Sequence, residues 1–114
     1  MKKLFTILIL LTPFALQFCS SSKNAIKTQP KITYTGSVQP IMIANCSPCH
    51  FPPKGNKKAY DNYNAVKGDI DEILKRISRN PTDRGFMPFK QHKLSDSTIN
   101  VFVQWKNDGL VEYP

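Results

Sequence analysis

The residues with the clearest chemical meaning are Cys46, Cys49 and His50, which form the run Cys-Ser-Pro-Cys-His. Haem carries two vinyl groups and one iron, so covalent attachment needs two thiols on one side of a short turn, with an imidazole beside them. Residues i and i+3 share a face of a helical turn, which would allow both thiols to form thioethers. His50 would then be the proximal iron ligand. The run therefore predicts one covalently bound haem c.

Three other interpretations of this run remain open. A thioredoxin-like dithiol, the basis of a thiol-disulfide oxidoreductase, follows a strand in a βαβ unit, whereas residues 38–45 have helical spacing. A zinc site would use Cys46, Cys49, His50 and His92, but the adjacent Cys49 and His50 cannot easily enter one tetrahedral site. A disulfide between the two cysteines would close almost no loop and would stabilise little.

Met87, followed by Pro88, is the second chemical signal. Proline biases the preceding residue toward an extended backbone, which lets a side chain project from a loop. A thioether is a soft, neutral ligand that favours ferrous iron, so a His/Met pair raises the reduction potential and closes the iron to substrates. The alternative is that Met87 fills the core beside Phe86 and Phe89, a common role for methionine. We predict that Met87 is the distal iron ligand.

Two other residues compete for the distal position. His92 is the stronger alternative, because imidazole is an equally plausible iron ligand, and bis-His ligation would lower the potential relative to His/Met. Met42 is the weaker one, because it lies one helical turn before Cys46, on the segment that carries the proximal side. The remaining possibility is an open sixth site, which would suit a haem-based ligand sensor or a peroxidase-like enzyme.

The first 18 residues have the pattern of a signal peptide. Residues 1–3 carry two lysines, and residues 4–16 are mostly apolar. The apolar stretch is too short to span a bilayer comfortably, which favours a cleaved signal over a retained anchor. Export predicts a periplasmic or cell-envelope location.

Cys19 follows this segment and resembles the processing site of a bacterial lipoprotein, with Leu16 three residues before it. Phe18 departs from that pattern, because a small residue is expected before the lipidated cysteine. A lone free thiol would be a liability in an oxidising compartment, which also favours lipidation. We expect residues 19–32 to form a lipidated cysteine and a flexible tether, because they have few apolar positions and no periodicity.

The charge balance does not require a nucleic acid partner. The full chain has a formal net charge of +8, and removal of residues 1–18 leaves 14 cationic against 8 acidic side chains, a formal charge of +6. Two haem propionates would lower this value by about two units. We expect no nucleic acid partner, and we expect a monomer.

Residues 33–114 are enough for one small domain, which we predict to be all-α. The first helix is expected over residues 38–45, with Pro40 in its first turn, followed by a loop over residues 51–56. A carbonyl in that loop or farther on should accept the Nδ1–H of His50. Such a small domain buries a modest core, and haem would reinforce it.

Two further helices and a short helical segment complete the predicted domain. The short segment surrounds Tyr60, Tyr63 and Val66. Asp69 is then expected as the N-cap of a helix whose apolar stripe is Ile70, Ile73, Leu74 and Ile77. The last helix is expected to begin after Ser95, with Leu94 and Ile99 as a hydrophobic staple, and to stop at Gly109. Its predicted buried face is Ile99, Phe102, Val103 and Trp105.

With these motifs in order, residues 33–111 resemble the small monohaem class I cytochrome c domains of bacteria. The residues that carry the resemblance are Tyr34, Val38, Pro40 and Ile41, the run Cys46–His50, Met87-Pro88, Leu94-Ser95, Trp105 and Gly109. Phe51 departs from it, because many relatives have a glycine after the histidine. The resemblance implies a compact helical fold around one haem, first and last helices that cross near it, and electron transfer as the function.

Electron transfer needs orientation, electrostatics and a tuned iron, and no catalytic group. Nothing in the chain resembles an acid/base pair or an activated nucleophile, so we do not expect an enzyme. Lysines follow the haem motif and the predicted methionine ligand, at positions 54, 57, 58, 90 and 93. These lysines could form a basic rim at the haem edge that attracts an acidic redox protein. A generic solvated surface explains them equally well.

Overall fold

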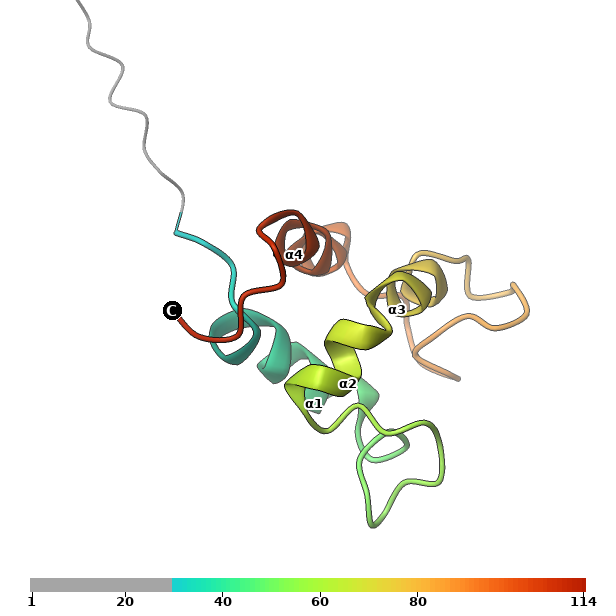
Figure 1. Cartoon of the computed structure of the whole chain (residues 1–114). Helices are drawn as coiled ribbons and strands as arrows, with labels where there is room; N and C mark the ends of the chain where they lie inside the picture. Colours follow the sequence, from blue (N-terminus) through green and yellow to red (C-terminus); the bar gives the residue numbers. More distant parts are fainter. Residues whose placement is uncertain (1–29) are drawn as a thin grey trace, which may run out of the picture.

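The computed structural model describes residues 30–114, which form helices and loops without a strand (Figure 1). The elements in chain order are η1 (Tyr34–Val38), α1 (Gln39–Cys46), α2 (Tyr63–Gly68), α3 (Ile70–Ile77) and α4 (Asp96–Asn107). The helical fold class is therefore confirmed for this part of the chain. The predicted signal peptide, Cys19 and the tether up to residue 29 lie outside the described residues. Within residues 30–114, no helix has the length and apolar character needed to cross a membrane.

The first helical segment begins earlier than predicted, at Tyr34 instead of Val38. Its first turn, η1, is a π-helix capped by Thr33, whose hydroxyl accepts a backbone N–H at 3.3 Å. The C-terminal tail also supports this turn, because the N–H of Tyr34 donates to the carbonyl of Val111 at 2.8 Å. Figure 1 shows the tail beside the start of the described chain. The early start depends on a partner distant in sequence, which local periodicity cannot show.

The cap of α3 differs from the prediction. The side chain of Asp69 makes no capping hydrogen bond to the helix, although the predicted stripe of Ile70, Ile73 and Ile77 is buried. The preceding helix, α2, is capped instead by Asn62, whose side chain accepts a backbone N–H at 3.0 Å. Tyr60 lies before α2, outside any helix. The Asp69 carboxylate is thus available for other partners.

The limits of α4 agree with the sequence. The hydroxyl of Ser95 accepts a backbone N–H from the first turn at 3.1 Å, as expected for an N-cap. Gly109 follows the helix with a φ of +88°, a left-handed conformation that glycine adopts without steric cost. The predicted buried face is only partly right, because Phe102 and Trp105 are buried while Val103 is 37% exposed.

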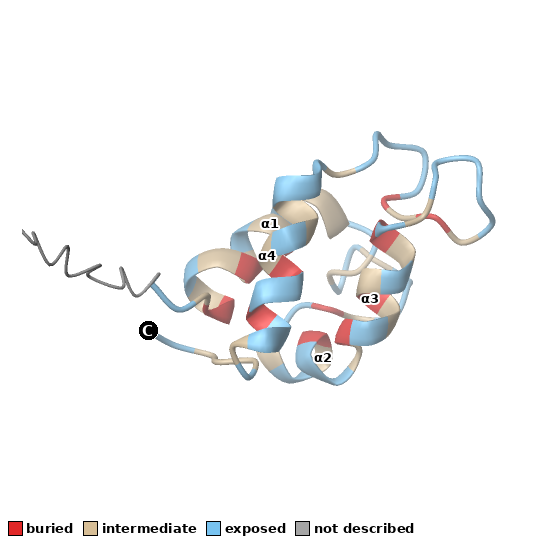
Figure 2. Cartoon of the chain, turned by 90° about the horizontal axis from the view of Figure 1, so that it is seen from above, coloured by how far each residue is buried: buried red, intermediate tan, exposed pale blue. Residues whose placement is uncertain are grey.

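The core is one cluster of buried side chains contributed by all five elements and by the loop before α2. Figure 2 shows the buried positions on the sides of the helices that face one another. α3 packs against α4, and α4 also contacts η1. The members are Tyr34, Val38, Met42, Tyr60, Val66, Ile70, Ile73, Ile77, Phe102 and Trp105. This packing places α1, α3 and α4 around the candidate site.

Candidate functional site

A cavity of about 630 Å³ opens between α1, α3, α4 and two loops. This volume is in the range of small-molecule and cofactor sites, about 300–1,000 Å³. Four residues predicted from the sequence line the cavity together: Cys46, Cys49, His50 and Met87. The tertiary structure therefore joins the Cys-x-x-Cys-His run to the methionine loop.

The interior of the cavity is largely apolar. Met42 comes from α1, Ile73 and Ile77 come from α3, and Phe102 comes from α4. Each of these side chains is at most 5% exposed in the structure. Charged side chains also line the cavity, from the loop after the haem motif and from α3, including Lys58, Asp69 and Arg76. A mostly apolar group with polar edges would fit the chemistry of this lining.

The haem motif forms a tight turn directly after α1. The helix ends at Cys46, and the N–H of His50 donates to the carbonyl of Cys46 at 3.1 Å. The following loop presses against this turn, because a Cβ on Gly55 would lie 2.3 Å from the carbonyl oxygens of both Pro48 and Cys49. Only glycine allows this approach, so the loop holds the motif closely.

The two cysteines lie in different environments. Cys46 is half-buried and Cys49 is exposed. Burial raises the pKa of the Cys46 thiol to about 11, and its Sγ donates to Met42 Sδ at 3.7 Å. Cysteines that exchange disulfides have lowered pKa values, because the thiolate is the nucleophile. The environment of Cys46 differs from that of a dithiol oxidoreductase.

The described residues do not form the zinc site that we considered from the sequence. Residues 30–114 contain no group of three or more His, Cys, Asp or Glu side chains placed to hold a metal ion. A structural zinc site uses four such ligands. An axial pair in a haem site needs only one histidine and one methionine, so haem is unaffected by this result.

His50 is held by a backbone carbonyl that the sequence did not identify. Its Nδ1 lies 2.6 Å from the carbonyl oxygen of Lys58. Because a carbonyl only accepts, Nδ1 carries the proton, and the lone pair of the imidazole is on Nε2. The Tyr60 ring stacks on the imidazole, with the ring centroids 4.8 Å apart at an interplanar angle of 22°. The ring is thus fixed in a tautomer suited to metal ligation through Nε2.

Asp69 connects this support to α3. Its carboxylate lies 2.8 Å from the ammonium of Lys58 and accepts a hydrogen bond from the hydroxyl of Tyr60. The hydrogen bonds from Lys58 and then from Tyr60 hold the pKa of Asp69 below its usual value. Burial and the bond to Asp69 raise the pKa of the Tyr60 phenol, which remains a donor. The role expected for Asp69, a helix cap, is corrected to that of a link between loop and helix.

Met87 is attached to the other end of α3. Its N–H donates to the carbonyl of Arg76 at 3.3 Å, and the Arg76 guanidinium is 3.5 Å from the carbonyl of Gly85. Phe86, beside it, is buried, whereas Met87 is half-buried against the core and lines the cavity. The methionine loop is therefore anchored where its side chain can reach the cavity.

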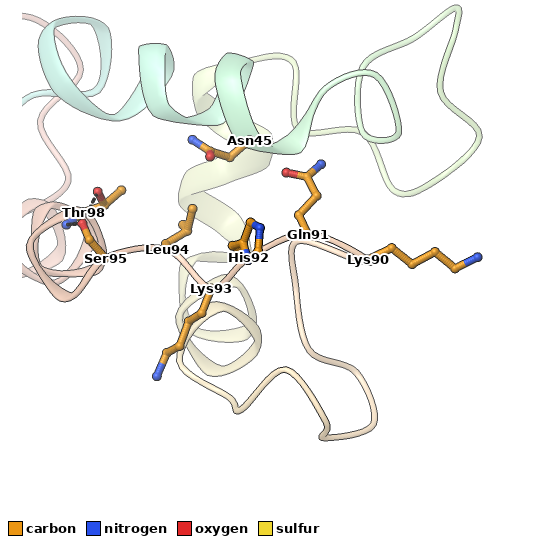
Figure 3. A pocket seen from close by; sticks show the side chains of 8 residues that line it. All are labelled: Asn45, Lys90, Gln91, His92, Lys93, Leu94, Ser95 and Thr98. Atoms are coloured by element: carbon orange, nitrogen blue, oxygen red, sulfur yellow. Dashed lines mark hydrogen bonds between the residues drawn. The ribbon is translucent and has the colours of Figure 1, made fainter.

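His92 does not line this cavity but lies close to it, because the neighbouring hollow that it lines shares Asn45, Gln91 and Leu94 with the cavity. It lines a second, more open hollow at the start of α4, with Asn45, Leu94 and Ser95 among its neighbours (Figure 3). His92 is exposed, and among the described residues it is not part of the lining shared by His50 and Met87. Met87, and not His92, is therefore in the lining of the cavity that contains the Cys-x-x-Cys-His run.

Four of the five predicted lysines line these two hollows, and Lys54 lines neither. Lys57 and Lys58 line the main cavity, and Lys58 is paired with Asp69. Lys90 lines the second hollow, and its ammonium lies 5.3 Å from the ring centroid of Phe89. Phe89 lines the main cavity and is 67% exposed. Cations and one exposed aromatic ring thus border the cavity.

A search for relatives gave no match to any protein-family model, to any curated protein or to any solved structure. Interpretation of the site therefore depends on the chemistry of its residues and on their geometry.

Proposed function

We propose that this chain is an electron-transfer c-type cytochrome with one covalent haem and His/Met ligation. The observation that carries the proposal is the shared cavity, in which two cysteines, a histidine with its Nδ1–H engaged, and a methionine from a separate loop come together. Haem c would use all four side chains, the two thiols for covalent attachment and the imidazole and thioether as iron ligands.

The residues present fit haem c. Cys46 and Cys49 would form the thioethers, and His50 Nε2 and the Met87 sulfur would bind the iron. When bound, haem supplies an iron that gains and loses a single electron. The protein orients the two ligands through α3, excludes water with the apolar lining, and favours the ferrous state by providing a thioether.

The alternatives have less support. An open sixth site, as in a sensor or a peroxidase-like enzyme, would leave Met87 only a packing role, although this side chain lines the cavity. A dithiol enzyme would require a reactive cysteine pair, whereas burial raises the pKa of Cys46. Neither alternative uses all four residues.

The proposed setting is the bacterial cell envelope, with lipid on Cys19 and residues 19–32 as the tether. The supports are the signal-like N-terminus and the position of Cys19 behind it. A monomer would present the cavity edge, with Lys57, Lys90 and the exposed ring of Phe89, to an acidic redox protein. We do not propose a nucleic acid partner.

The decisive experiment is an optical spectrum of protein produced with haem-attachment machinery. We expect a low-spin spectrum with a weak absorption near the red end of the visible range, present in the oxidised protein and lost on reduction, which marks methionine bound to iron. A high-spin spectrum would instead support the open-site alternative.

A second experiment tests covalent attachment. Cys46→Ala combined with Cys49→Ala should abolish haem staining at the mass of the protein on a denaturing gel, because these are the only two thiols in the cavity. Cys19→Ala is the matched control, since it also removes a thiol and should retain the stain. Persistent staining of the double variant would contradict the proposal.

A further inference from the structure

The segment of residues 57–60 supports the haem motif through three hydrogen bonds. The N–H of Lys57 donates to the carbonyl of Cys49 at 3.1 Å, and the N–H of Tyr60 donates to the carbonyl of His50 at 2.9 Å. Between them, the carbonyl of Lys58 accepts from Nδ1 of His50 at 2.6 Å. We call residues 57–60 the support segment. Its position determines the hydrogen bond on the ligand imidazole.

Asp69 attaches the support segment to α3 through two side chains, those of Lys58 and Tyr60. One contact is the Lys58 ammonium at 2.8 Å, and the other is the Tyr60 hydroxyl. The Asp69 side chain is 19% exposed and the Tyr60 residue is 8% exposed, so the hydroxyl bond is shielded from water. A carboxylate with two donors of this kind restrains the segment more strongly than either contact alone.

The hydrogen bond on the second nitrogen of a ligand imidazole changes the properties of the metal. A firm acceptor at Nδ1 makes Nε2 more basic, which stabilises ferric iron more than ferrous iron and lowers the reduction potential. If the support segment moves away, this bond lengthens and the potential rises.

We propose that Asp69 is a positioning residue for His50, acting through Lys58 and Tyr60 to maintain the Nδ1 hydrogen bond and thereby lower the reduction potential. The inference rests on the proposed haem function. The effect of Asp69 on the Nδ1 hydrogen bond depends neither on the covalent attachment nor on the identity of the distal ligand.

Two opposite charge changes separate positioning from simple electrostatics. Asp69→Asn removes a negative charge, and Lys58→Met removes a positive one. If the charges act on the iron only through space, Asp69→Asn would raise the reduction potential and Lys58→Met would lower it. If the charges act through the support segment, both variants would raise the reduction potential, because each breaks the ion pair between Lys58 and Asp69. Tyr60→Phe changes no charge and should also raise it.

The experiment is potentiometry on full-length holoprotein of the wild type, these three variants and Asp71→Asn. Asp71 is the matched control, since it carries the same charge two residues away, is 78% exposed, and pairs with Lys106 at 2.6 Å instead of with the support segment. We expect Asp69→Asn to shift the ferric-to-ferrous balance by about tenfold, ~59 mV for one electron. Asp71→Asn should shift it far less.

Proton exchange gives a second readout, independent of through-space charge. In the reduced protein, the Nδ1–H of His50 should exchange with solvent at least about tenfold faster in Asp69→Asn and in Tyr60→Phe than in Asp71→Asn, because its acceptor is less restrained. Should Asp69→Asn yield no holoprotein, the milder Tyr60→Phe carries the same two tests.

The two levels of inference fail differently. A wild type without covalent haem or without the methionine band would contradict the proposed function. If the wild type has covalent haem and the methionine band, two results would overturn only the role of Asp69. One is that Asp69→Asn and Lys58→Met shift the reduction potential in opposite directions. The other is that Tyr60→Phe changes neither the potential nor the proton exchange.

Discussion

The proposed haem should be required for folding, so that its removal costs this domain most of its folded structure. The cavity of about 630 Å³ is lined by residues of α1, α3 and α4, and its apolar walls include Met42, Ile73 and Phe102. With the cofactor absent, these walls would face either a void or water. Both outcomes are unfavourable, because apolar surface gains stability only when it is packed.

The size of the cavity indicates the scale of the effect. Empty cavities in protein cores cost about 24 cal/mol per Å³, so a closed void of this size would cost ~15 kcal/mol. The cavity is partly open and partly polar, so this value is an upper bound. A domain of about 85 residues has a total stability of ~4–13 kcal/mol. The penalty is comparable to the whole stability, so the haem-free chain should not keep this structure.

Circular dichroism and fluorescence can measure this loss. Trp105 is the only tryptophan in the chain and is fully buried, so its emission reports the core directly. Protein produced without attachment machinery should show a weak helical signal, no cooperative thermal transition and red-shifted emission, and the Cys46→Ala/Cys49→Ala variant should match it. Holoprotein is the control for helical content. A haem-free protein with full helical signal, cooperative melting and buried emission would refute the reasoning.

Three further outcomes are expected. Met87→Ala should keep covalent haem, open the iron to added ligands and lower the reduction potential, while His92→Ala changes little; the reverse pattern in spectra and potentiometry would indicate bis-His ligation. Cys19→Ala should move the protein from membranes to the soluble fraction or leave an unprocessed precursor, and a mature wild type without acyl mass in mass spectrometry would exclude lipidation. Phe102→Ala in holoprotein should lower the free energy of unfolding by about 3–5 kcal/mol in urea titrations, because the ring is fully buried; a loss below ~1 kcal/mol would show that the cavity wall tolerates the gap.

Features with local causes were predictable from the sequence. The limits of α4 depend on Ser95 at its start and Gly109 after its end, and both act on the backbone within a few residues. The buried stripe of α3 follows from the spacing of Ile70, Ile73 and Ile77. These signals depend on the geometry of one helix, so they can be recognised without knowledge of its neighbours.

Features with distant causes were missed or misassigned. The helical segment begins at Tyr34, where Thr33 caps it and where the C-terminal tail, which is far away in the sequence, accepts the Tyr34 N–H. Asp69 has the position of a helix cap, but Lys58 and Tyr60 compete successfully for its carboxylate. Val103 is apolar and lies next to Phe102 in α4, yet it remains partly exposed because the packing of α4 leaves its side uncovered.

The sequence by itself determined which chemical groups are available, because the spacing of Cys46, Cys49 and His50 is a property of one short turn. From the sequence we predicted Met87 as the distal ligand, with His92 as the alternative, because both follow in the same loop and both have suitable chemistry. Only the tertiary structure places Met87 on the cavity and His92 outside its lining, and only it supplies the Lys58 carbonyl for His50. These placements arise from the packing of loops against α3, which is the sum of many long-range contacts and leaves no local pattern in the chain.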